Sequence, residues 1–256
     1  MAPTILGTRV DPTSYKAATS LVLAWAQESE SRTVCVANVH VIMETYDSPN
    51  FRKIVNSADL ITPDGIPLVW VLRLKGFRHQ ERVYGPDLTL QVLQAAETAG
   101  LQVGFYGSSP EVLAALQLRL LTSFPSLRIV YAWSPPFRPL NADEEEQALQ
   151  QIEASRARIL FVGLGCPKQE YWMAAHSDRI KAVMLGVGAA FDFHAGFKPQ
   201  APVWMQKSGL EWLFRLASEP KRLWRRYLYH NPRFLWLVGL ELIGLYKLKQ
   251  KRSGQQ

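Results

Sequence analysis

One carboxylate of the sequence, Asp64, occupies a position in which an enzyme could carry a catalytic group. Asp64 follows the apolar run 60–62 and Pro63, and a second apolar run begins directly after Gly65. A carboxylate in that position can take a proton from an attacking hydroxyl group. It can also be an ordinary turn residue or a helix N-cap, which are common roles for aspartate before glycine. Taken alone, Asp64 favours the turn interpretation.

Residues able to bind or react also follow the other apolar runs. They are Asn38 and His40 after 33–37, Gly107 and Ser108 after 102–106, Gly163, Gly165 and Gln169 at and beyond the end of 158–163, and Asp192 and His194 after 182–187. In open parallel sheets, ligands bind beyond the carboxyl ends of the strands. All of these residues would lie at that edge, so their convergence predicts one binding site more strongly than any single residue does.

Two of these segments combine a glycine with a proline. YGSSPE (106–111) and GLGCPKQE (163–170) end a strand with glycine, and a proline opens the next helix. The free N–H groups and the dipole of such a helix start bind anions, so a nucleotide diphosphate is favoured. Neither segment is a Walker sequence, and GLGCPK lacks the full G-x-G-x-x-G pattern that would specify NAD. An ordinary capped turn explains GSSP better, whereas both interpretations stay open for GLGCPKQE.

The segments RVYGPDL (82–88) and FDFHAG (191–196) add charged and imidazole groups. Arg82 could hold an anion or simply be solvated, and Asp87 could stabilise the helix start after Pro86. An extended FDFHAG segment would place Asp192 and His194 on the same side, where they could bind a sugar or transfer a proton. His194 is equally well explained as a hydrogen-bonded structural residue.

The sequence predicts neither a metal site nor a nucleophile. His79, His176 and His230 show no spacing to partner residues, and no His, Cys and Asp cluster has metal-ligand spacing. Cys35 is interpreted as a core residue and Cys166 as a loop thiol, and two cysteines are too few for a disulfide framework. There is no G-x-S-x-G elbow.

The elements that must position these residues alternate along the chain. Apolar runs at 33–37, 59–62, 102–106, 128–132, 158–163 and 182–187 are nearly continuous, as expected of strands covered on both faces. Helical patterns lie between them, at 86–99, 110–122 and 143–155 among others. This alternation predicts an α/β fold with a mostly parallel sheet flanked by helices, which we place at residues 1–200.

Residues 201–256 are predicted to form a basic, aromatic helical appendage. Their patterns are helical only, and Pro220 and Pro232 are placed to start or kink helices. Residues 215–256 carry ten Lys and Arg against two acids, a net charge of +8, while the rest of the chain, with 19 basic and 20 acidic residues, carries −1. Such a segment favours an anionic partner, which could be phosphates, nucleic acid or acidic lipid. No apolar run reaches the ~20 residues of a bilayer span and no signal peptide is recognisable, so a cytoplasmic protein is expected.

Taken in order, the motifs resemble those of the WecG/TagA/CpsF glycosyltransferase family of bacteria. The segments that carry the resemblance are ANVHVIME (37–44), ADLITPDGIPLVW (58–70), ERVYGPDL (81–88), FYGSSPEV (105–112), ILFVGLGCPKQEYWM (159–173), GVGAAFDFHAG (186–196) and APVWMQKSGLEWLFRLASEPKRLWRRYL (201–228). The resemblance implies a Rossmann-like core with a C-terminal helical appendage. It also implies inverting transfer of an N-acetylmannosamine-type or related sugar from a UDP donor to a polyprenyl-diphosphate-linked saccharide, in the synthesis of teichoic acid or other surface polysaccharides.

The resemblance also assigns roles to individual residues. Asp64 matches the aspartate that acts as general base, and Arg82 matches an arginine of the motif after the second strand. Asn38, Gln169 and Asp192 match positions in the donor and acceptor pocket, and Arg215, Arg222 and Arg225 match appendage positions that reach the diphosphate. Helix starts and arginines can stabilise the departing UDP without a metal, so no cofactor is expected. Val36, His40 and Pro67 depart from the family pattern, which leaves the sugar and the acceptor open.

A lipid-linked acceptor places the protein at the inner face of the cell membrane. Each Lys or Arg of the appendage near an anionic surface contributes roughly 1 kcal/mol, and interleaved aromatic residues suit the headgroup boundary. The rival interpretations are a nucleic-acid-binding protein, another nucleotide-dependent enzyme such as a nicotinamide oxidoreductase, and a non-catalytic membrane scaffold. The balanced charge of residues 1–200 argues against nucleic acid, and the incomplete glycine pattern argues against NAD. The sequence leaves a homo-oligomer open.

Overall fold

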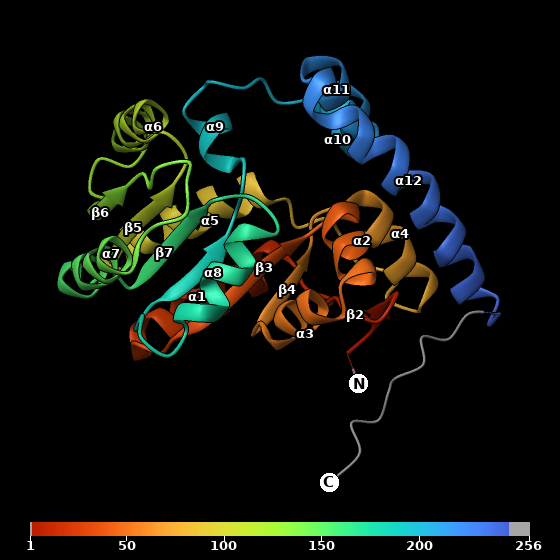
Figure 1. Cartoon of the computed structure of the whole chain (residues 1–256), viewed down its shortest axis with the longest axis horizontal. Helices are drawn as coiled ribbons and strands as arrows, with labels where there is room; N and C mark the ends of the chain where they lie inside the picture. The colour runs from red at the N-terminus through yellow and green to blue at the C-terminus, as the bar shows by residue number, and fades with distance from the viewer. Residues whose placement is uncertain (1, 246–256) are drawn as a thin grey trace, which may run out of the picture.

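The computed structural model describes residues 2–245 and is built on a six-stranded parallel sheet (Figure 1). The strands are β3 (Arg32–Ala37), β4 (Leu60–Pro63), β5 (Gln102–Gly107), β6 (Arg128–Trp133), β7 (Ile159–Gly163) and β8 (Val183–Gly186), in the spatial order β4-β3-β8-β7-β5-β6. A short antiparallel hairpin, β1 (Thr4–Ile5) and β2 (Thr8–Arg9), stands apart from the sheet. All carboxyl ends of the six strands therefore lie at one edge.

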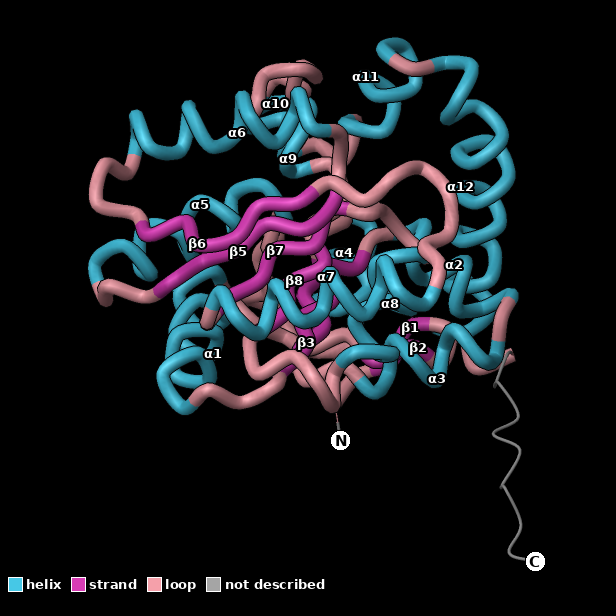
Figure 2. The backbone as a smooth tube through the Cα atoms, turned by 60° about the vertical axis from the view of Figure 1, so that its left-hand side comes forward, coloured by secondary structure: helices cyan, strands magenta, loops and turns pink. Residues whose placement is uncertain are grey.

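Helices cover both faces of the sheet, which Figure 2 shows between its cyan helices. One face is covered by α2 (Val39–Asp47), α3 (Pro49–Ser57), α4 (Ile66–Leu74), α7 (Ala142–Ser155) and α8 (Lys168–His176), and the other by α1 (Tyr15–Glu28), α5 (Gly85–Thr98), α6 (Pro110–Ser123) and α9 (Ala190–His194). Successive residues of β3 alternate between the two hydrophobic cores: Cys35 and Ala37 belong to one, Val34 and Val36 to the other. Burial on both faces explains why the strands are apolar throughout.

The appendage consists of α10 (Val203–Lys207), α11 (Glu211–Ser218) and α12 (Pro220–Leu242). In Figure 1, α12 runs along the side of the core beside α2 and α4. Phe234 and Val238 of α12 are buried in the core cluster of that face. Glu241 accepts a hydrogen bond from the backbone N of Leu6 at 3.0 Å and pairs with Lys75 at 3.2 Å. Apolar burial and polar contacts therefore both hold α12 on the core.

The fold predicted from the sequence is confirmed. Each of the six apolar runs is a strand, and the three helical patterns are α5, α6 and α7. Helix α12 begins at Pro220 and continues through Pro232. Among residues 2–245, none of the helices has both the length and the apolar character that a bilayer span requires. Lys247, Lys249, Lys251 and Arg252 of the basic tail lie outside the described residues.

Two local predictions are wrong. The FDFHAG segment is not extended, because Ala190–His194 form the short helix α9. Residues two apart on a helix point about 200° apart, so Asp192 and His194 do not share a side. Pro167 is not the first residue of a helix either; it is the N-cap of α8, which begins at Lys168.

Candidate active site

A cleft of about 290 Å³ lies between the carboxyl ends of β3 and β4 and the appendage. Five of the predicted site residues line it: Asn38, His40, Asp64, Arg82 and Arg215. The appendage adds Glu211, Arg226, Tyr227 and His230, which the sequence did not indicate. The cleft therefore needs both parts of the chain.

Strand pairing places Asp64 beside Asn38. Ala37 and Pro63, the last residues of β3 and β4, are register partners, so the residues that follow them are neighbours. The backbone N of Asp64 donates to the carbonyl of Ala37 at 2.8 Å. Asn38 is the N-cap of α2, because its Oδ1 accepts from the backbone N of His40 at 3.0 Å. The N-cap of α4 is Gly65, so the Asp64 carboxylate is free of a capping role.

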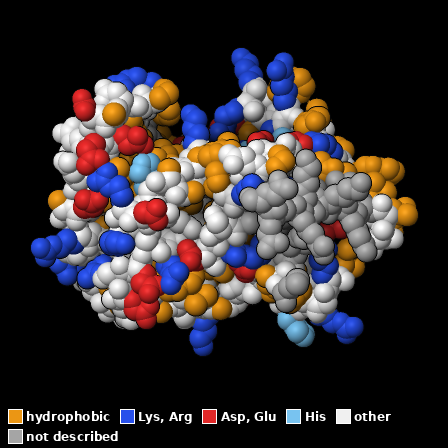
Figure 3. Space-filling view, turned by 60° about the horizontal axis from the view of Figure 1, so that its bottom comes forward, with side chains coloured by type: hydrophobic (Ala, Val, Ile, Leu, Met, Phe, Trp, Pro, Cys, Tyr) orange, Lys and Arg blue, Asp and Glu red, His pale blue; other side chains and the backbone are white. Residues whose placement is uncertain are grey.

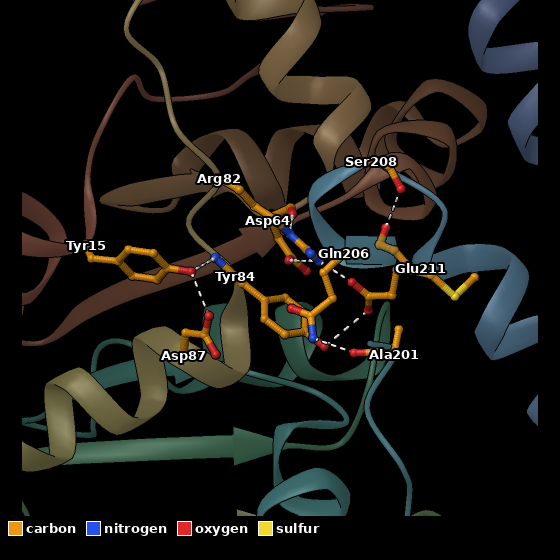
Figure 4. A network of polar contacts seen from close by, with 10 residues as sticks. Tyr15, Asp64, Arg82, Tyr84, Asp87, Ala201, Gln206, Ser208 and Glu211 are labelled. Carbon is orange, nitrogen blue, oxygen red and sulfur yellow. Dashed lines mark hydrogen bonds and ion pairs between the residues drawn. The ribbon is translucent and has the colours of Figure 1, made fainter. Parts of the chain in front are cut away.

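Arg82 joins Asp64 to the appendage (Figure 4). Its Nη2 lies 3.1 Å from Asp64 Oδ1 and 2.6 Å from Glu211 Oε2, and its Nε donates to the Asp64 carbonyl. The hydroxyl of Tyr84 donates to Glu211 Oε1 at 3.2 Å. The Arg82 guanidinium also lies over the Tyr84 ring, 3.9 Å from its centroid. Two carboxylates thus share one arginine, and one of them belongs to α11.

This environment changes the acidity of Asp64. Burial raises the pKa of Asp64 to about 6; the positive charge of Arg82 opposes the rise and the negative charge of Glu211 adds to it. The side chain of Asp64 is 13% exposed, so the carboxylate still reaches the cleft. A general base works best when its pKa lies near the operating pH, and a carboxylate of pKa about 6 is ionised at neutral pH while remaining a stronger base than an ordinary aspartate.

Two arginines of the cleft, Arg215 and Arg226, have no ion-pair partner within residues 2–245. Among the described residues, neither Arg215 nor Arg226 forms an ion pair with a carboxylate, and Arg226 Nε is buried without a hydrogen-bond partner. Burial lowers the pKa of Arg226, and the charge of Arg215 lowers it further. A buried charge without a partner costs free energy. An anion bound between these guanidinium groups would remove that cost.

The glycine segments are used mainly for packing. A Cβ on Gly107 would lie 2.6 Å from the carbonyl carbon of Gly163, and a Cβ on Gly163 would lie 2.6 Å from the Phe191 ring. The backbone N of Ser108 donates to the Gly163 carbonyl, and Ser109 caps α6. The GSSP segment is therefore an ordinary capped turn, and none of Gly107, Ser108 and Gly163 lines the cleft.

Gln169 holds the loops around β7 and β8 together. Its Oε1 accepts from the backbone N of Gly165 at 3.2 Å and of Gly188 at 3.0 Å, and its Nε2 donates to Glu170 Oε1 at 2.9 Å. The side chain is buried and lies outside the cleft lining. The backbone N–H of Gly165, which could donate to a phosphate, thus donates to the amide oxygen of Gln169.

The remaining predicted residues also lie outside the cleft lining. Asp87 is exposed and accepts from the Tyr15 hydroxyl at 3.2 Å, and Asp192 lies 3.5 Å from Lys198. Nε2 of His194 lies 3.0 Å from the Pro86 carbonyl, which is a structural contact. Arg222 pairs with Glu219, and Arg225 is exposed beside Trp224.

One sequence signal could have indicated Arg226 as a residue of the cleft. Leu223, Arg226, His230, Phe234 and Val238 recur at intervals of three and four residues, which places them on one face of α12. Because Phe234 and Val238 are buried against the core, this face turns toward the core. Glu211 and Tyr84 gave no comparable signal, since their role depends on contacts across the chain.

An open parallel sheet with a carboxylate and two arginines in a cleft at its carboxyl edge is the arrangement expected of an α/β enzyme. Comparison with known proteins makes the class specific. Residues 3–248 match the Glycosyl transferase WecG/TagA/CpsF family, and the chain belongs to that family. It is therefore a glycosyltransferase, and the resemblance seen in the sequence is confirmed. One similar protein is the N-acetylglucosaminyldiphosphoundecaprenol N-acetyl-beta-D-mannosaminyltransferase of Bacillus spizizenii, which is 31% identical over 209 residues, covering 81% of this chain and 79% of the relative.

Proposed function

We propose that the protein transfers an N-acetylmannosamine-type sugar or a related hexose from a UDP donor, with inversion, to a polyprenyl-diphosphate-linked saccharide. The observation that carries this proposal is Asp64, a buried carboxylate with a pKa of about 6 in a cleft that also holds unpaired arginines. The activity named for the Bacillus relative supports the type of sugar and the lipid-linked acceptor.

In this mechanism, Asp64 takes the proton of the acceptor hydroxyl as that oxygen attacks the anomeric carbon of the donor sugar. The bond from the anomeric carbon to the UDP oxygen breaks on the opposite side, which inverts the configuration. Negative charge then develops on the departing diphosphate, and Arg215 and Arg226 are the cleft cations free to stabilise it. Arg82 is held by two carboxylates and instead orients Asp64. These protein groups supply both parts of the chemistry, so we expect turnover without an added metal.

The test uses the purified chain, anionic membranes, a polyprenyl-diphosphate-linked N-acetylglucosamine acceptor and a panel of UDP-sugars. We expect UDP release with one donor and a loss of at least about 100-fold in Asp64→Asn, because general-base catalysis contributes about 10²–10⁴-fold. Release that is unchanged in Asp64→Asn would return Asp64 to a structural role. If none of the UDP-sugars in the panel gave UDP release, the proposed substrates would be refuted.

The same proposal places the protein on the inner face of the cell membrane through its appendage. Large apolar side chains are exposed on α10 and α12, among them Trp204, Trp224, Leu228, Leu235 and Trp236. Figure 3 shows hydrophobic side chains along the right-hand edge of the molecule, where Figure 1 places α12. Arg222 and Arg225 are exposed on the same helix and suit anionic headgroups.

Co-sedimentation with anionic vesicles tests the membrane contact. Trp236→Glu should weaken binding, because it puts a charge in place of a side chain that is 69% exposed on α12. Leu118→Glu on α6, where the side chain is 72% exposed, is the matched control and should bind like the wild type. Equal binding by all three proteins would refute a role for α12.

A further inference from the structure

Three potential metal ligands meet where the appendage packs on the core. His40 and Glu44 lie on α2, one turn apart on the same face, and His230 lies on α12. His40 Nδ1 is 3.6 Å and His230 Nε2 is 3.8 Å from the same atom, Glu44 Oε1. One ligand atom from each of the three residues lies within 4.8 Å of the other two. Figure 2 shows α2 and α12 side by side.

We propose that His40, Glu44 and His230 form a binding site for a divalent transition-metal ion of the Zn²⁺ class, which fastens α12 to α2. Imidazole nitrogen and carboxylate oxygen are ordinary Zn²⁺ ligands. With bonds of about 2.0–2.1 Å, tetrahedral ligand atoms stand about 3.3 Å apart. The two measured separations exceed this value by only a few tenths of an ångström.

The hydrogen bonding of His40 prepares it as a ligand. Its Nδ1 is buried without a hydrogen-bond partner among the described residues and lies 3.6 Å from Glu44 Oε1. The backbone carbonyl of Cys166 lies close to the same ring. A histidine that binds a metal commonly donates its other ring N–H to a carbonyl, which fixes the tautomer and the ring orientation. In His230 the nitrogen that approaches Glu44 is Nε2, and the other ring nitrogen, Nδ1, is buried without a partner among the described residues.

The charges around the three residues partly balance a cation. Arg226 acts on both histidines and opposes a second positive charge, whereas the carboxylates of Glu44 and Asp47 attract one. Neutral imidazole and ionised carboxylate are the forms that bind metals.

The ion would have a structural role at the wall of the cleft, since His40 and His230 also line it. Its ligands come from the core and from the appendage, so binding would favour the docked position of α12. Arg226 lies on the same face of α12, one turn before His230, and would be held in the cleft with it. The proposal does not depend on the identity of the donor or the acceptor.

The test titrates the full chain, stripped with EDTA, with Zn²⁺ by calorimetry and with Co²⁺ by visible absorption. We expect one tight site per chain, a Co²⁺ spectrum typical of tetrahedral coordination, and a Zn²⁺-dependent rise in Tm of roughly 5 °C at about 100-fold excess over Kd. His230→Gln and Glu44→Gln should each weaken Zn²⁺ binding by at least about 100-fold. The control His79→Ala removes an exposed histidine and should bind like the wild type.

Two results would overturn the proposed metal site. Absence of the Co²⁺ spectrum and of a tight Zn²⁺ site in the wild type would overturn the proposal without any variant. Equal Zn²⁺ affinity in the wild type, His230→Gln and Glu44→Gln would place the ion elsewhere and overturn it as well. Comparing Tm in EDTA shows whether each variant is folded, and the two substitutions on different helices serve as independent tests.

Discussion

Glu211→Gln should lower the pH at which the enzyme becomes active. Glu211 Oε2 and Asp64 Oδ1 contact the same nitrogen of Arg82, at 2.6 and 3.1 Å, so the two carboxylate oxygens lie less than about 6 Å apart. Their repulsion contributes to the raised pKa of Asp64. The glutamine keeps the size and an oxygen acceptor for Arg82, but it removes the charge and leaves Arg82 to interact with Asp64 alone.

The magnitude follows from Coulomb's law. At about 5 Å and an effective dielectric constant between about 20 and 40, the repulsion is roughly 2–3 kcal/mol, which corresponds to about 1–2 pKa units. The pKa of Asp64 should therefore fall from about 6 to roughly 4–5. Because the proposed base, Asp64, would act in its ionised form, the acidic limb of the pH profile of kcat/KM should move down by the same amount.

The assay is UDP release as a function of pH in the wild type, Glu211→Gln and Glu219→Gln. Glu219 pairs with Lys198 and Arg222 rather than with Arg82, so this variant should keep the wild-type limb. The carbon NMR shift of the Asp64 carboxyl group reports the same pKa without any turnover. A limb and a carboxyl titration that stay near pH 6 in Glu211→Gln would refute the electrostatic coupling between α11 and the base.

Three further predictions concern stability. The pKa of Asp64 is raised to about 6 in the folded state, so its contribution to stability is most favourable below about pH 4 and is lost as the pH rises through about 6. The unfolding free energy of Asp64→Asn should therefore gain roughly 3 kcal/mol relative to that of the wild type between about pH 4 and 7. A difference in unfolding free energy, measured with urea, that stays the same at all pH values would contradict this. Phe234→Ala should cost roughly 3–5 kcal/mol in urea denaturation because the ring is buried in the core, whereas Trp236→Ala on the exposed side should change stability by less than about 0.5 kcal/mol; equal effects would show that α12 is not docked in solution. Gly107→Ala should lower Tm by more than Gly76→Ala. Both positions have positive φ, but only at Gly107 would the new Cβ also meet the backbone of Gly163. Equal losses of Tm would show that backbone strain alone accounts for the destabilisation.

The sequence determined the core of this protein because its strands are continuous apolar runs separated by helical periodicity. All six strands and the edge that carries Asp64 and Asn38 follow from that pattern. Parallel strands covered on both faces are apolar throughout, so they can be recognised from the local sequence alone. The ordered motifs also identified the family. Local signals failed where two conformations compete over a few residues, as in FDFHAG, which is α9 in the structure.

The tertiary structure alone decided what surrounds Asp64. Glu211 is 147 positions further along the chain, and no spacing rule connects it to Arg82 or to the acidity of the base. His40 and His230 have no recognisable metal spacing for the same reason, because their ligand atoms meet only when α12 packs on α2. The glycines and Gln169, for which the sequence predicts ligand binding, also pack strands together or join loops in the structure. Local patterns fix which residues can carry a reaction, whereas burial and charge from distant segments set their pKa values and partners.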